Sequence, residues 1–128
     1  MVVDASALLD VLLRLPNAAE IEVRLLEQSM LHAPHLIDVE VAQVVRRYSL
    51  TGRIDEQRAR EVLADLADFP MRRYPHTALL ARVWELRDNF SAYDAAYVSL
   101  ADALDAPLLT RDRRLATAAR QHVRVELV

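Results

Sequence analysis

Apolar residues along the chain form short runs that alternate with longer segments of helical character. The longer segments are rich in Ala, Leu and Arg, which all favour helices. Short strands separated by helices are typical of crossover connections in a parallel sheet. The pattern predicts one three-layer α/β/α domain over residues 1–128, with five strands at Met1–Val3, Met30–Ala33, Met71–Tyr74, Pro107–Leu109 and Val123–Leu127.

Helical spacing is clearest in two stretches, residues 35–69 and 75–105, and each is long enough for two helices. Apolar residues recur there every three or four positions, which places them on one face of a helix. Trp84 lies among aliphatic residues at a similar spacing, and we expect it in the core. The predicted buried positions are Ile37, Val41, Val44 and Tyr48 in the first stretch and Tyr93, Tyr97, Leu100, Ala101 and Leu104 in the second.

Composition excludes several classes of protein. Cys is absent, which rules out disulfides and thiolate metal sites and favours a reducing compartment. Lys is absent and Gly52 is the only glycine, so a glycine-rich phosphate loop with its lysine cannot form. The chain has neither an apolar stretch of about 18 residues nor a basic leader. We therefore expect a cytoplasmic protein without a membrane span.

Four acidic residues fall where a ligand would bind. Asp4 directly follows the first strand and Asp112 follows the fourth by three residues. The carboxyl ends of parallel strands share one edge of the sheet, and ligands bind beyond that edge. Asp94 lies at the start of a helix and Glu40 in the first turns of another, each at the border of the buried face. The pattern predicts that these carboxylates meet.

Each of these residues also has a purely structural interpretation. Asp4 and Asp112 could cap the helices that follow them. Asp94 stands three residues after Ser91, the spacing of a capping box. Glu40 could be solvated or paired with an arginine. Taken together, however, carboxylates about 4 Å apart repel by about 4 kcal/mol at an effective dielectric near 20, and a cation relieves that repulsion. Oxygen ligands without Cys or His suit Mg²⁺ or Mn²⁺.

The charge balance agrees with a bound cation and an anionic substrate. Sixteen arginines face 19 acidic residues, a net charge of −3, and neutralising the four carboxylates leaves 15 acidic residues. Arginine suits bidentate contacts to phosphate. Pairs at 46–47 and 72–73 offer cationic patches, although most arginines in such a chain simply keep its helices soluble. Arg111, Arg113 and Arg114 flank Asp112 and are the preferred substrate contacts.

Four segments together resemble the PIN-domain family, with the order and spacing of the VapC toxins of VapBC toxin–antitoxin pairs. The resemblance covers essentially the whole chain. An aspartate after a strand is common, so each motif alone is weak and the signal lies in all four in order. The segments are Val2–Leu9, Asp38–Val41, Ser91–Tyr97 and Leu108–Leu115.

The resemblance implies a fold, a site and an activity. The fold would have strand order 3-2-1-4-5. Asp4, Glu40, Asp94 and Asp112 would be the catalytic quartet, with Asp4, Asp94 and Asp112 as metal ligands and Ser6 and Thr110 as supporting hydroxyls. Glu40 would act through water, at a second metal or as a base. The activity would be Mg²⁺- or Mn²⁺-dependent hydrolysis of RNA, such as tRNA or ribosomal RNA, by metal-activated water. A VapB-type antitoxin would bind the toxin, and a homodimer is usual.

Other functions are less well supported by the residues. A receiver domain normally needs a lysine after its last strand, and a phosphatase with an aspartate nucleophile normally has a second aspartate where this chain has Ser6. Attack by the RNA 2′-hydroxyl normally uses a pair of general acid–base groups. The four histidines, at positions 32, 35, 76 and 122, show no such pairing. A catalytically silent module that binds RNA or antitoxin and a nuclease that cleaves DNA both remain open as alternatives.

Overall fold

A five-stranded parallel sheet forms the centre of the molecule, seen here in a computed structural model that describes residues 1–128. The strand order is β3-β2-β1-β4-β5, as predicted, and every pairing is parallel. Each predicted strand lies within two residues of an observed one. The strands are β1 (Val2–Val3), β2 (His32–Pro34), β3 (Arg72–Tyr74), β4 (Leu108–Thr110) and β5 (Val125–Leu127).

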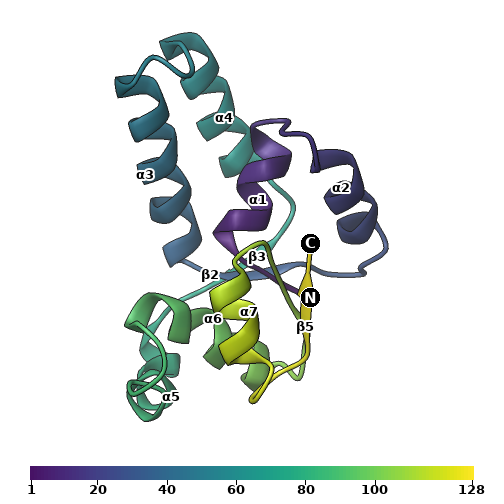
Figure 1. Cartoon of the computed structure of the whole chain (residues 1–128), viewed down its shortest axis with the longest axis vertical. Helices are drawn as coiled ribbons and strands as arrows, with labels where there is room; N and C mark the ends of the chain where they lie inside the picture. The colour runs from purple at the N-terminus through teal and green to yellow at the C-terminus, as the bar shows by residue number, and fades with distance from the viewer.

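Helices cover both faces of the sheet. Figure 1 shows α1 to α4 on one side of β2 and β3 and α5 to α7 on the other, which is the three-layer arrangement predicted. None of these helices combines the length and the hydrophobicity that a membrane span requires. The helices are α1 (Ala5–Leu12), α2 (Ala18–Leu26), α3 (Leu36–Leu50), α4 (Glu56–Asp68), α5 (Leu80–Glu85), α6 (Ala92–Ala103) and α7 (Arg113–Ala119), with a 3₁₀ turn η1 (Thr77–Leu79) before α5.

The core joins the strands to one face of each long helix. Thirty buried apolar residues form a single cluster, and the two residues of β1 are fully buried, as expected for a central strand covered on both faces. On α3 the buried positions are Ile37, Val41 and Val45, whereas the predicted Val44 and Tyr48 are only partly covered. The spacing identified this helix correctly but placed its buried face slightly off.

Three aromatic or aliphatic residues predicted to be buried are exposed instead. Trp84 is 67% exposed on α5, a short helix in which no residue is buried, and its ring centroid lies 4.5 Å from the guanidinium carbon of Arg87. Tyr93 and Leu104 lie at the two ends of the α6 face, beyond the neighbouring elements that cover Tyr97 and Leu100. Periodicity could not show where the covering elements end.

The topology creates a crevice between β1 and β4. The chain leaves β1 toward β2 and β3 on one side and returns to β4 and β5 on the other. Val2 pairs with both His32 and Leu108, so the three central strands end close together. In open parallel sheets such a reversal of strand order is where ligands bind.

Candidate metal centre and catalytic site

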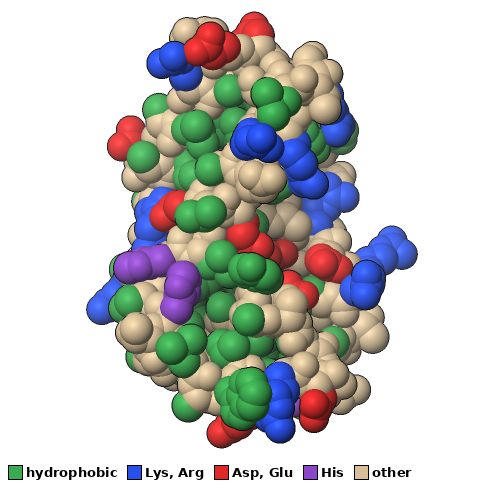
Figure 2. All heavy atoms as spheres, turned by 90° about the vertical axis from the view of Figure 1, so that its left-hand side faces the viewer, with side chains coloured by type: hydrophobic (Ala, Val, Ile, Leu, Met, Phe, Trp, Pro, Cys, Tyr) green, Lys and Arg blue, Asp and Glu red, His purple; other side chains and the backbone are tan.

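All four predicted carboxylates line one cleft at the carboxyl ends of the strands. The cleft has a volume of about 480 Å³, and it contains Asp4, Glu40, Asp94 and Asp112. Asp4 follows β1, Glu40 lies on α3, Asp94 lies in the first turn of α6, and Asp112 precedes α7. Figure 2 shows acidic side chains gathered at the middle of this face, with arginines above and to the right of them. Acidic residues from segments far apart in the sequence thus line the same cleft.

Asp4 is held by two hydroxyls on one oxygen. It is only 7% exposed, and its Oδ2 accepts hydrogen bonds from Ser6 Oγ and, at 2.7 Å, from Thr110 Oγ1. Its side chain does not cap α1 by hydrogen bonding, although Asp4 occupies the N-cap position. Burial raises the pKa of Asp4, and the two hydroxyls lower it by a smaller amount. The structure therefore disfavours the capping interpretation for this residue.

The helix-cap alternatives turn out differently for Asp94 and Asp112. Ser91 is the N-cap of α6, because its Oγ accepts a hydrogen bond from the Asp94 N–H at 3.1 Å. The Asp94 carboxylate is therefore not needed as the cap of this helix. Asp112 does cap α7: its Oδ1 accepts from Arg114 N–H at 2.8 Å and Leu115 N–H at 3.1 Å. One Asp112 oxygen is thus committed to the helix, and the other is available to the cleft.

Glu40 is tied to the core through a buried tyrosine. The Tyr97 hydroxyl donates to Glu40 Oε1 at 2.6 Å, and the tyrosine is fully buried. Burial of Glu40, together with the charges of Asp4 and Asp94, raises its pKa, whereas the tyrosine hydrogen bond lowers it. Glu40 is therefore neither fully solvated nor paired with an arginine. The apolar spacing predicts Tyr97 in the core but not this polar contact. A tyrosine in an apolar stripe is the signal that could have suggested it.

The carboxylates affect one another electrostatically. Burial is the main reason why the pKa of Asp94 is raised, and the charges of Asp4 and Asp112 raise it further. Arg114 acts in the opposite direction on the same carboxylate. Raised pKa values with mutual repulsion in one cleft are typical of a functional site rather than of solvated surface acids.

Comparison with known proteins agrees with this geometry. The PIN domain family model matches residues 1–121. The chain is 44% identical to Ribonuclease VapC1 of Mycobacterium tuberculosis over 99% of its own length and 96% of that protein. It is 39% identical to Ribonuclease VapC9 of the same species, over 100% and 98% of the two lengths. The chain belongs to the PIN-domain family and, within it, to the VapC proteins.

Solved structures support the fold of this VapC-family chain. It superposes on the crystal structure of PAE2754 from Pyrobaculum aerophilum with a TM-score of 0.69 and 24% identity, covering 96% of this chain and 81% of that one. It superposes on VapBC2 from Rickettsia felis, crystallised with a DNA fragment from its promoter, with a TM-score of 0.70 and 13% identity, covering 98% and 96%. At these identities the likeness concerns the fold alone.

The donor set of this VapC-family cleft fits a hard divalent cation. Asp4 is buried without an arginine partner, and every candidate ligand is a carboxylate oxygen. As the side chains stand, no three acidic or histidine residues converge closely enough to hold an ion between them. This arrangement suits Mg²⁺, which keeps several of its waters and is usually bound through one or two carboxylates. The residues thus fit a partly hydrated ion rather than an enclosed cage.

The three predicted arginines lie in different surroundings. Arg111 does not line the cleft, and its guanidinium pairs with Asp10. Arg113 and Arg114 are exposed in the first turn of α7 and form no ion pair. Arg47, expected only as part of the cationic pair at 46–47, lines the cleft itself. Its position seven residues after Glu40, two turns along the same helix, is a signal that could have indicated it.

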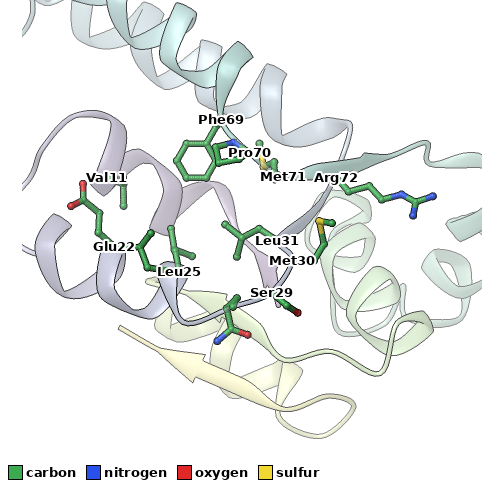
Figure 3. Close-up of a pocket in the computed structure, with 12 residues that line it drawn as sticks. Val11, Glu22, Leu25, Ser29, Met30, Leu31, Phe69, Pro70, Met71 and Arg72 are labelled. Carbon is green, nitrogen blue, oxygen red and sulfur yellow. The ribbon is translucent and has the colours of Figure 1, made fainter.

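A larger hollow lies away from the acidic residues of this VapC-family chain. Its volume is about 820 Å³, and it opens between α1, α2 and the segment that joins α4 to β3. Figure 3 shows Leu25, Leu31 and Phe69 lining it, with Glu22 and Arg72 toward its ends. Its lining is mostly apolar and holds a single acid, so it is not a second candidate for the metal centre.

Proposed function

We propose that this chain is the toxin of a type II toxin–antitoxin pair and acts as a Mg²⁺- or Mn²⁺-dependent endoribonuclease. The observation that carries the proposal is the cleft that Asp4, buried and without a counter-ion, lines together with three further acidic residues. The names of the VapC relatives, which are ribonucleases, support the same activity. The expected substrates are structured RNAs of the tRNA or ribosomal RNA class, and the expected location is the cytoplasm.

The side chains have separate roles in this proposal. Asp4, Asp94 and Asp112 would hold the ion, in part through its waters, and the bound ion would supply polarisation of a phosphoryl oxygen and a lowered pKa of water. Ser6 and Thr110 fix Asp4 through its Oδ2, so its Oδ1 is the oxygen left to face the ion. Tyr97 fixes Glu40 through Oε1, which leaves Oε2 to orient a water or accept its proton.

Cleavage of RNA by the purified chain tests the proposal. Mg²⁺ or Mn²⁺ should support cleavage and EDTA should abolish it. Asp4→Asn and Asp94→Asn should lose it by at least a hundredfold while keeping the fold. Asp102→Asn is the matched control, because Asp102 lies on the same helix as Asp94 but pairs with Arg82 on the surface. An Asp102→Asn loss as large as that of Asp94→Asn would remove the case for the cleft.

The products and the choice of nucleic acid distinguish the remaining mechanisms. Hydrolysis should leave 5′-phosphate and 3′-hydroxyl ends, whereas attack by the RNA 2′-hydroxyl would leave a 2′,3′-cyclic phosphate. A digest of matched RNA and DNA in the same buffer separates a ribonuclease from a DNA-cleaving nuclease. Binding of RNA without turnover, under any divalent ion, would favour the catalytically silent module.

The proposal includes a VapB-type antitoxin and a homodimer as partners. Leu26 is 84% exposed and Met30 50% exposed at the apolar hollow of Figure 3, and exposed apolar patches of this kind mark interaction sites. Co-expression with the product of an adjacent small open reading frame should yield a stable complex without ribonuclease activity. Light scattering of the chain alone should give twice its 14.5 kDa mass.

A further inference from the structure

The side chain of Arg111 is partly buried against α1 and does not line the cleft. Its guanidinium forms an ion pair with Asp10 of α1, which is only 5% exposed. With its amide oxygen turned toward the guanidinium, Asn17 accepts from both terminal nitrogens, at 3.1 and 3.2 Å. Two residues from the α1–α2 region thus occupy the fork of this arginine, and little of it is left for a substrate phosphate.

The main chain beside Arg111 supports the acidic site directly. The Arg111 N–H donates to Ser6 Oγ at 3.0 Å, and Ser6 in turn donates to Asp4. The next N–H, that of Asp112, donates to Thr110 Oγ1 at 3.0 Å, and Thr110 donates to the same Asp4 oxygen. Two successive amides of the turn between β4 and α7 therefore orient both hydroxyls that hold Asp4.

An ion pair whose carboxylate is buried is a strong anchor for such a turn, and Asp10 is the buried partner of this pair. Removing one partner of a buried pair leaves an uncompensated charge, so the remaining partner resists separation. The planar fork of arginine also fixes direction, which the point charge of a lysine does not. The pair with Asp10 and the contact to Asn17 hold Arg111 in place, and its own amide and that of Asp112 are held with it.

We infer that Arg111 is a positioning residue, which clamps the β4–α7 turn onto α1 so that Ser6, Thr110 and Asp112 keep their places around Asp4. Its effect on cleavage rests on the proposed function, but its effect on the turn and on the ion does not. The arginines suited to contact phosphate are different ones. Arg47 lines the cleft, and the charge of Arg114 lowers the pKa of Asp94. Neither arginine forms an ion pair within the chain.

The test compares Arg111→Met with three other variants. Arg111→Lys keeps the charge without the fork. Arg114→Gln removes an exposed cation whose charge acts on the Asp94 carboxylate. Arg24→Met is the control, because Arg24 also joins a helix to a distant element, by pairing with Glu126 of β5, but lies away from the cleft. For each variant, hydrogen exchange at the Arg111 and Asp112 amides, Mn²⁺ affinity by calorimetry, kcat, KM and the salt dependence of RNA binding are measured.

Arg111→Met should speed exchange of both amides at least tenfold and weaken Mn²⁺ binding by roughly 10- to 100-fold, the usual effect of losing a group that orients metal ligands. It should lower kcat by a similar factor with KM within about twofold, and leave the salt dependence of RNA binding unchanged. Arg111→Lys should lie between this variant and the wild type. Arg114→Gln should reduce the salt slope by about one, as expected for a phosphate contact. Arg24→Met should change none of these.

The opposite pattern overturns the inference. If Arg111→Met leaves both amides protected but raises KM and reduces the salt slope, the arginine contacts substrate. Should that variant fold poorly, Asp10→Leu with Arg111→Met replaces the pair by apolar residues, which is often neutral for stability. This double variant should melt like the wild type yet keep the fast exchange; recovery of slow exchange would also refute the clamp. If the wild type cleaves no RNA, the proposed function fails, while exchange and Mn²⁺ affinity still decide the role of Arg111.

Discussion

Replacing Asp94 with Asn should stabilise the metal-free protein at neutral pH. Burial and the charges of Asp4 and Asp112 raise the pKa of Asp94, and Arg114 offsets part of this effect. Ser91 caps the helix through the main chain of residue 94, so Asn at this position leaves the cap intact. The substitution thus removes a charge that is repelled more than it is attracted, and the only favourable interaction lost is the attraction of Arg114.

The size of the effect follows from the charges around Asp94. Like charges repel by about 4 kcal/mol at 4 Å and by about 2 kcal/mol at 8 Å when the effective dielectric is near 20. Two carboxylates repel Asp94 and one guanidinium attracts it, so roughly one repulsive pair remains, and solvent at this half-buried site weakens it further. We expect a gain of roughly 1–2 kcal/mol, which for a chain of this size raises Tm by about 3–8 °C.

The pH dependence has a definite sign. Because the pKa of Asp94 is higher in the folded chain than its ordinary value of 3.8, the folded state binds that proton more tightly than the unfolded state does. The stability that this proton supplies is complete below pH 3.8 and is lost as the pH rises through the higher folded pKa. The advantage of Asp94→Asn should therefore be largest at neutral pH and shrink as the pH falls toward 4.

Thermal melts in EDTA between pH 4 and 8 measure this difference. The same melts with Mn²⁺ at a hundredfold excess over its Kd should stabilise the wild type by about 2.7 kcal/mol and the variant by much less. Asp102→Asn, with only a surface ion pair to lose, should change stability by less than about 1 kcal/mol at any pH. A metal-free Asp94→Asn protein that melts below the wild type at neutral pH would refute the electrostatic reasoning.

Three further substitutions test the support of the site. Tyr97→Phe removes the 2.6 Å hydrogen bond that lowers the pKa of Glu40, so that pKa should rise. The acid limb of the pH–rate profile should then move to higher pH. If this limb does not move, ionisation of Glu40 does not control the cleavage rate. Thr110→Val removes one donor to Asp4 and should weaken Mn²⁺ binding measured by calorimetry, whereas Thr117→Val, on the exposed side of α7, should not. His76→Ala removes the acceptor of the Leu36 N–H at the start of α3, 2.9 Å away, and should cost about 1 kcal/mol in urea denaturation; no loss would show that water replaces the imidazole.

The sequence was sufficient for the fold because its strongest signals are local and repeated. Five apolar runs separated by helical spacing predict the strands, and each lies within two residues of its predicted place. The strand order came from family resemblance, since runs and spacing alone do not order a sheet. Burial of residues near the ends of helices was harder to predict from the sequence. Trp84 and Tyr93 have the spacing of buried residues, but no neighbouring element covers them.

The acids of the site were predictable and the polar contacts around them were not. An aspartate after a strand and another at a helix start are placed by topology alone, which is why Asp4 and Asp94 could be expected in one cleft. The partners of long side chains depend on the tertiary structure. Arg111 stands next to Asp112 in sequence, yet its guanidinium lies against Asp10, about a hundred residues earlier in the chain.

Two buried aspartates close in sequence show why this cleft would bind a cation. Asp10 and Asp4 are almost equally covered, at 5% and 7% exposed. Asp10 has the guanidinium of Arg111, whereas Asp4 has neutral donors alone, including two hydroxyls on one oxygen. A buried carboxylate without a cation is costly, and three more acids nearby increase that cost. Arg111, the neighbour of Asp112 in sequence, neutralises Asp10 and not Asp4, so the cleft keeps a negative charge that a divalent ion would compensate.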